Sequence, residues 1–171
     1  MKPVPLYFPF LLALTMTLFG TVFFPNLRLI PFAPFLAIVF TRKTFINSLW
    51  LACLCGLIFD LLTSQFRLGL YALNYCLTTV LVYHQKRNFF EDKPLALSVF
   101  TVLVSCASTV LQLFLLYAFD QGLNLSMKLV LTDMIAMPIL DGGYAFLWFA
   151  LPMKLFKYVQ KVGWKFLYRK L

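Results

Sequence analysis

The chain has 171 residues, of which 62% are hydrophobic and 12% are charged. Soluble domains contain about 45–50% apolar and about 25% charged residues, so this composition excludes an ordinary soluble domain and predicts an integral membrane protein. The formal net charge is +9. The basic residues lie at the ends of apolar runs, where anionic membrane lipids attract them, so we expect lipid and not nucleic acid as their partner.

Six segments match the requirement for a membrane-spanning helix, which is about 20 predominantly apolar residues. They predict an all-α, polytopic bundle of about six transmembrane helices that forms one domain over residues 1–171. The second segment is short and contains Pro31 and Pro34. We expect it to be broken, tilted or partly re-entrant, which a bilayer tolerates only where protein covers the loosened backbone. The predicted spans are 5–24, 29–40, 45–62, 68–83, 95–119 and 129–153.

The positions of the basic residues support this number of spans. With the N-terminus inside, all 15 Lys and Arg residues except Arg28, Arg67 and Lys128 fall on the inner side. Cytoplasmic loops collect Lys and Arg, so the pattern predicts that both termini are cytoplasmic. Lys86 and Arg87 then mark an inner loop.

Residues 154–171 carry a second basic pattern. Lys154, Lys157, Lys161 and Lys165 recur every three or four residues, and apolar residues occupy the other face. This spacing predicts a basic amphipathic cytoplasmic tail within the same domain. The alternative is a run of basic residues without fixed structure after the last span.

The four cysteines all fall within apolar spans. We expect them to be buried, reduced thiols that behave as small hydrophobic residues. The spacing of Cys53 and Cys55 fits neither a zinc site nor a thioredoxin-type pair. No recognisable catalytic, phosphate-binding or metal-binding motif occurs, so we predict a non-enzymatic protein without a cofactor or metal. An intramembrane enzyme would need converging acids or a histidine on facing helices.

Acidic residues inside a bilayer cost free energy and usually have a functional or structural partner. Asp60 falls near the end of a span that starts inside, and Asp133 falls about one turn into a span that starts outside. Both should lie near the outer surface, as should Arg67. We therefore predict a cluster of Asp60, Arg67 and Asp133 that closes the outer end of the bundle.

Asp141 should lie deeper, roughly 18 Å below the outer boundary at 1.5 Å per residue. No basic residue is expected at that depth. The residue could be protonated, accept hydrogen bonds, or face a partner protein or a polar cavity. Pro138, with Gly142 and Gly143, should loosen the helix around it. The candidate donors are Asn74, Tyr75, Ser105 and Ser108.

Small residues recur at every fourth position of the third span, at Ser48, Ala52 and Gly56. Similar pairs occur at Ala13 with Thr17 and at Ala33 with Ala37. Such faces let helices approach closely, so we interpret them as packing surfaces.

The segment 56–92 resembles the central signature of the rod-shape-determining MreD family. It contains Gly56-x-x-x-Asp60 at the end of one span, an outer turn that ends in Leu-Gly-Leu around Gly69, and a following helix with Asn74. A basic inner loop with paired aromatic residues completes the likeness. Two positions depart from the family pattern, since Pro34 lacks a following acid and Pro138 is followed by Asp141 in place of an asparagine.

The resemblance implies a fold similar to the substrate-binding subunits of energy-coupling-factor vitamin transporters. It also implies a non-enzymatic role in the bacterial cytoplasmic membrane, in the elongation complex that guides lateral peptidoglycan synthesis. The implied partners are the single-span protein MreC, with MreB, RodA and a penicillin-binding transpeptidase.

The alternative is a substrate-binding membrane subunit of a vitamin transporter. That function would require an outward pocket with several polar residues, and an Ala-x-x-x-Ala pair in the first span. Here the first span has Ala13 with Thr17. We therefore favour the assembly role, and co-purification with a single-span partner or with a small ligand would separate the two.

Overall fold

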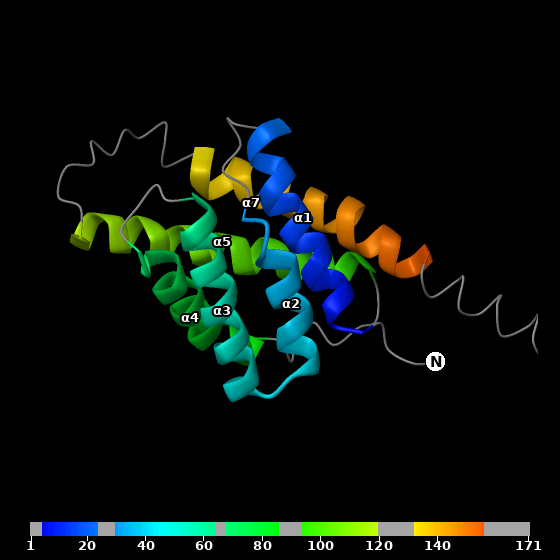
Figure 1. Cartoon of the computed structure of the whole chain (residues 1–171), viewed down its shortest axis with the longest axis horizontal. Helices are drawn as coiled ribbons and strands as arrows, with labels where there is room; N and C mark the ends of the chain where they lie inside the picture. Colours follow the sequence, from blue (N-terminus) through cyan, green and yellow to red (C-terminus); the bar gives the residue numbers. More distant parts are fainter. Residues whose placement is uncertain (1–4, 24–29, 64–67, 86–93, 120–131, 156–171) are drawn as a thin grey trace, which may run out of the picture.

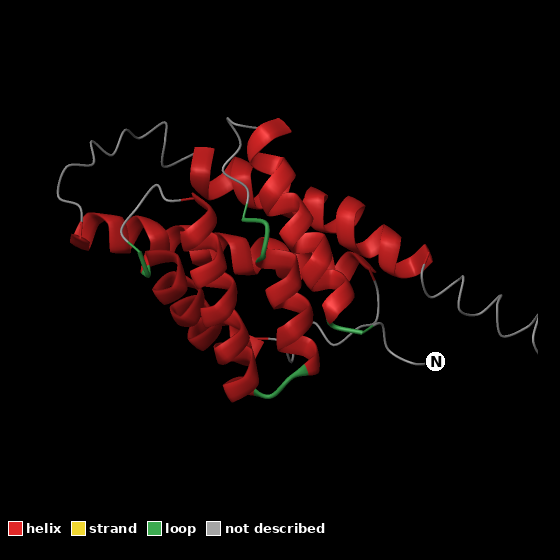
Figure 2. Ribbon diagram, in the orientation of Figure 1, coloured by secondary structure: helices red, strands yellow, loops and turns green. Residues whose placement is uncertain are grey.

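The computed structural model describes residues 5–23, 30–63, 68–85, 94–119 and 132–155, and every regular element in these ranges is helical (Figures 1 and 2). A helix lies in each of the six segments predicted to span the membrane, which confirms the all-α prediction. The helices are α1 (Tyr7–Phe23), α2 (Ala33–Arg42), α3 (Phe45–Thr63), α4 (Leu70–Val82), α5 (Pro94–Phe119), and a last helix made of η2 (Thr132–Ala136), α7 (Met137–Tyr144) and η3 (Ala145–Ala150).

Three helices are long and apolar enough to cross a membrane: α3, the Ala96–Phe119 part of α5, and the last helix over Met134–Leu155. Tyr7–Gly20 and Ala33–Arg42 are shorter apolar helices. Large apolar side chains point outward from the three long helices, including Trp50 at 65% exposure and Phe114 at 65%. Such faces are stable against lipid and costly in water, so the chain is built as a membrane protein.

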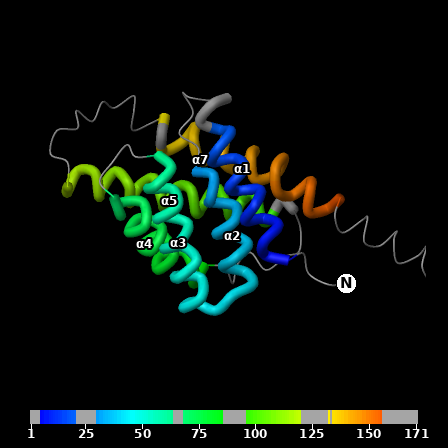
Figure 3. Tube along the Cα trace, viewed as in Figure 1, coloured from blue at the N-terminus to red at the C-terminus, as the bar shows by residue number. Residues whose placement is uncertain are grey.

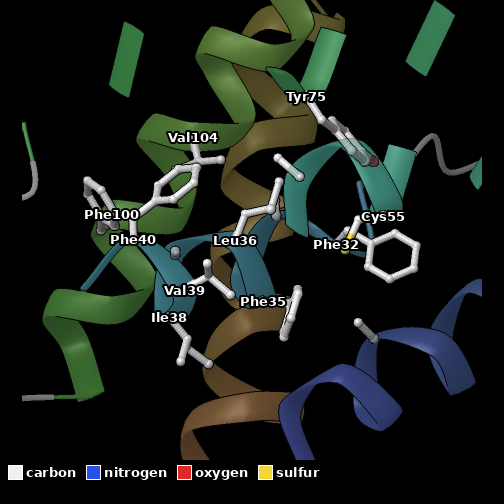
Figure 4. Close-up of a cluster of buried hydrophobic side chains, with 14 of the residues drawn as sticks. Phe32, Phe35, Leu36, Ile38, Val39, Phe40, Cys55, Tyr75, Phe100 and Val104 are labelled. Atoms are coloured by element: carbon white, nitrogen blue, oxygen red, sulfur yellow. The ribbon is translucent and has the colours of Figure 1, made fainter. Parts of the chain in front are cut away.

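The short helix α2 is the centre of the fold. Every residue from Pro31 to Phe40 is buried, and aromatic and aliphatic side chains from neighbouring helices surround them (Figure 4). Helices α1, α3, α5 and α7 pack against α2 (Figure 3). Its ten residues extend about 15 Å, half the hydrocarbon thickness. The second segment is thus short and covered by protein on all sides, as expected.

The predicted small-residue face of α3 is also confirmed. Ser48, Ala52 and Gly56 are all buried, and α4 packs directly against this face at Gly56. The pairs Ala13 with Thr17 and Ala33 with Ala37 are buried as well.

The last helix is irregular on both sides of Asp141. Residues Thr132–Ala136 and Ala145–Ala150 form π-helical turns. Helix α7 between them is regular and has a buried Pro138 in its first turn. π-Turns are wider than α-turns and shift the register of the side chains. The irregularity therefore flanks the acid and leaves it on a regular helix.

Several predictions concern residues outside the described ranges. Arg67, Lys86, Arg87 and the tail after Leu155 belong to this group, as does the side chain of Asp133. They stay predictions.

Candidate functional site

Asp60 joins α3 to the start of α4. Its side chain is 6% exposed, and its carboxylate accepts backbone N–H groups from Gly69 at 3.1 Å, Tyr71 at 3.2 Å and Ala72 at 3.2 Å. The first N–H groups of a helix have no partner within that helix, and the helix dipole favours negative charge there. Asp60 therefore caps α4 from the preceding helix.

Two glycines make this cap geometrically feasible. A Cβ atom on Gly56 would lie 2.3 Å from Ala72 Cα, so α3 and α4 can approach this closely only because Gly56 has no side chain. Gly69, immediately before α4, has a φ of +94°, a left-handed conformation that glycine adopts at little cost. In the described parts of the segment that carries the family resemblance, 56–63 and 68–85, α3 and α4 thus pack closely around Asp60.

The predicted outer cluster is tested only at Asp60. Three backbone N–H groups already occupy its carboxylate, as described above. Whether Arg67 and Asp133 approach it stays a prediction, because these side chains are outside the described part of the chain.

Asp141 lies at the other buried polar centre. The side chain is fully buried, accepts a hydrogen bond from the hydroxyl of Ser105 on α5, and accepts the backbone N–H of Ile30 at 3.1 Å. Ser105 was among the predicted donors, so that contact is confirmed. Asn74, another predicted donor, instead donates to Ser108 at 2.9 Å.

The contact with Ile30 explains why an acid is present here. Ile30 and Pro31 form the non-helical lead into α2, and non-helical backbone inside a membrane must find partners within the protein. Asp141 accepts the N–H of Ile30, and the hydroxyl of Tyr144, one turn further along α7, donates to the carbonyl of Pro31 at 3.4 Å. Helix α7 therefore stabilises the break before α2.

Helix α5 carries a polar stripe, buried except at the half-buried Gln112, that links these centres. Gln112 donates to the Tyr71 hydroxyl at 3.1 Å, and Ser108 and Ser105 bond to Asn74 and Asp141 as described above. Along α5, Ser105 thus bonds to α7, and Ser108 and Gln112 bond to α4. Interhelical hydrogen bonds of this kind hold membrane helices together. The members of the stripe are Ser98, Thr101, Ser105, Ser108 and Gln112.

Sequence reasoning missed much of this network. The backbone of Ile30, the Tyr144–Pro31 contact and the Gln112–Tyr71 contact were not predicted. The available signal was the spacing of three and four residues between polar side chains in an otherwise apolar α5, which places them on one helix face.

Two buried polar atoms have no hydrogen-bond partner among the described residues. They are the side-chain oxygen of Asn74, which is fully buried, and the hydroxyl of Tyr75, which is 1% exposed. Buried polar atoms are normally paired with protein or with ordered water. Both belong to α4, beside the polar stripe and the aromatic core.

The prediction for the cysteines needs a correction. All four are free thiols, as expected, but Cys55 alone among them is buried, and Cys53, Cys76 and Cys106 are half-buried. Their helices pack through other faces, which leaves these three thiols at the edges of the helix contacts. No group of three or more His, Cys, Asp or Glu in the described ranges could hold a metal ion.

The geometry above is that of a helix bundle whose buried acids bind backbone groups. No family model, curated protein or solved structure matches this chain. Its role must therefore be argued from its own residues.

Proposed function

We propose that the chain is a non-enzymatic assembly protein of the bacterial cytoplasmic membrane. In this proposal it is an MreD-like component of the elongation complex that guides lateral peptidoglycan synthesis. It acts by binding the membrane helix of a single-span, MreC-like protein, and MreB, RodA and a penicillin-binding transpeptidase are further proposed partners. The proposed fold is that of the energy-coupling-factor binding subunits.

The observation that supports this role most is that both buried acids bind groups of the protein itself. The carboxylates of Asp60 and Asp141 accept backbone N–H groups of the protein itself. Acids engaged in this way hold helices in place. Large apolar side chains project outward from α3, α4 and α5, and these surfaces suit lipid or the apolar helix of a partner.

Co-purification and cell shape test the role together. The full-length chain should co-purify with a single-span membrane partner from a rod-shaped bacterium, and its depletion should turn rods into spheres. If depleted cells stay rod-shaped and the purified chain carries no membrane partner, the proposal is wrong.

The unpaired atoms of Asn74 and Tyr75 favour one alternative, a subunit that binds a small polar molecule such as a vitamin. A bound ligand could donate to the Asn74 oxygen or bond to the Tyr75 hydroxyl. Native mass spectrometry of the chain purified in mild detergent would detect such a ligand. Loss of uptake of one vitamin on depletion, with wall synthesis unchanged, would favour the transporter function.

The proposed topology has six crossings with both termini in the cytoplasm. Three helices are long enough to cross unaided, and the burial of α2 supports a short second crossing that lies inside the protein bundle. A C-terminal reporter active only in the cytoplasm is expected. A reporter active only outside would contradict this topology.

A further inference from the structure

Two cysteines from different helices meet at the edge of the α3–α4 contact. Cys53 lies one turn before Gly56 on α3, and Cys76 lies one turn after Ala72 on α4. The two helices run antiparallel because a short connection joins them. One turn before Gly56 on α3 and one turn after Ala72 on α4, the next facing pair is therefore Cys53 and Cys76.

The thiols of this pair contact one another. The thiol of Cys76 lies close enough to that of Cys53 for the two to interact. Disulfide formation requires Cα atoms about 4.4–6.8 Å apart, a separation that few helix pairs offer. At the neighbouring Gly56–Ala72 contact the backbones of α3 and α4 are unusually near, since a Cβ on Gly56 would lie 2.3 Å from Ala72 Cα.

The two cysteines are also partly exposed at the surface of the helix bundle. Both cysteines are half-buried, whereas Cys55 is buried. Residues one turn on either side of the pair are exposed apolar side chains, with Trp50 and Leu57 flanking Cys53, and Leu73 and Val80 flanking Cys76. The surface around the thiols is therefore one that a lipid-soluble molecule can approach.

We propose that Cys53 and Cys76 form a redox-active dithiol within the membrane, which a lipid-soluble quinone oxidises to a disulfide. The two S–H bonds break and one Sγ–Sγ bond forms. The two electrons and two protons pass to the quinone, which is reduced to the quinol. The disulfide would link α3 to α4 beside the Asp60 hairpin, and the inference does not depend on the proposed assembly role.

Thiol counting tests the proposal on the full-length chain in lipid vesicles. The probe is a short-tailed, fully substituted benzoquinone, followed by denaturation and labelling with a maleimide polymer that adds visible mass for each free thiol. The wild-type chain has four cysteines. We expect two of them to be lost on oxidation and regained with dithiothreitol, and peptide mass spectrometry to identify the Cys53–Cys76 link.

Serine variants give matched controls. Cys53→Ser and Cys76→Ser should each retain all remaining thiols, whereas Cys55→Ser and Cys106→Ser should still lose two. Melting temperatures of the four variants, measured before oxidation, identify any variant that fails to fold. If one fails, the disulfide that mass spectrometry identifies in the wild type decides the question. The proposal is overturned if the wild type keeps all four thiols, if the link joins other cysteines, or if the thiols gain the mass of the quinone.

Discussion

The two buried aspartates perform the same task in two differently constructed regions. Asp60 binds three backbone N–H groups that lie nine to twelve residues further along the chain, whereas Asp141 binds one backbone N–H that lies 111 residues away, together with a serine hydroxyl. The α3–α4 hairpin is therefore local and has several bonds to one carboxylate. The region around α2 depends on fewer hydrogen bonds, which join segments distant in sequence. Each lost bond therefore removes a larger share of the bonds that hold this region.

The largest expected effect comes from the backbone contact inside the hairpin. In Gly56→Ala, the new methyl group would overlap backbone atoms of Ala72, which cannot rotate away. We expect a loss of about 3 kcal/mol in the free energy of unfolding, the upper end of the usual cost of overpacking. Unfolding of the purified variant in mixed micelles measures this loss. A melting temperature equal to that of the wild type would show that the helices are not this close.

Replacing each acid by leucine compares the two regions directly. Asp60→Leu leaves three N–H groups without an acceptor, and we expect a loss of about 2–3 kcal/mol, because caps and buried donors each contribute on this scale. Asp141→Leu leaves the Ile30 N–H and the Ser105 hydroxyl unpaired, for an expected loss of about 1–3 kcal/mol. Chemical unfolding of both variants decides the comparison. Stability equal to the wild type in either variant would show that the acid does not stabilise the fold through these bonds.

A pair of neighbouring glycines sharpens the description of α7. A Cβ on Gly142 would lie 2.4 Å from Val102 Cγ2, whereas a Cβ on Gly143 would contact nothing within 4 Å. Gly142→Ala should therefore cost about 1–2 kcal/mol as an overpacked contact with a side chain that can partly move. Gly143→Ala is the matched control and should be neutral or stabilising by up to about 1 kcal/mol, because alanine favours helix. The reverse order in thermal unfolding would contradict the packing of α7 on α5.

The smallest expected effect concerns the bond between Ser105 and Asp141. A double-mutant cycle of Ser105→Ala and Asp141→Asn should give a coupling of about 1 kcal/mol, typical of one hydrogen bond. The pair Ser98→Ala and Asp141→Asn is the control, because Ser98 lies two turns before Ser105 on the same stripe, whereas the carboxylate of Asp141 bonds to Ser105 and to Ile30. Additive effects in the Ser105 cycle would show that the two side chains act independently.

Much of the fold could be predicted from patterns within the chain. Apolar runs between basic residues predicted six helices, the prolines of the second run predicted a short covered segment, and the small residues at Ser48, Ala52 and Gly56 predicted a packing face. Each of these depends on nearby residues, which a sequence displays directly.

The partners of the acids were harder to predict for a physical reason. The donors to Asp60 and the donor Ile30 are backbone N–H groups, and every residue except proline has one, so residue identity does not reveal them. Ser105 was found because its hydroxyl is a distinctive side chain at a suitable depth. The Cys53–Cys76 contact was missed because the spacing within one helix was considered, whereas the pairing depends on the register between two.

Hydrogen exchange at single amides tests most directly that each acid binds its own backbone segment, Asp60 the start of α4 and Asp141 the lead into α2. In wild-type protein in lipid, the amides of Gly69, Tyr71, Ala72 and Ile30 should exchange slowly. Asp60→Leu should accelerate exchange at Gly69, Tyr71 and Ala72 and leave Ile30 protected, and Asp141→Leu should accelerate Ile30 alone among the four. Unchanged exchange at these amides in both variants, or acceleration of all four by either one, would contradict the account.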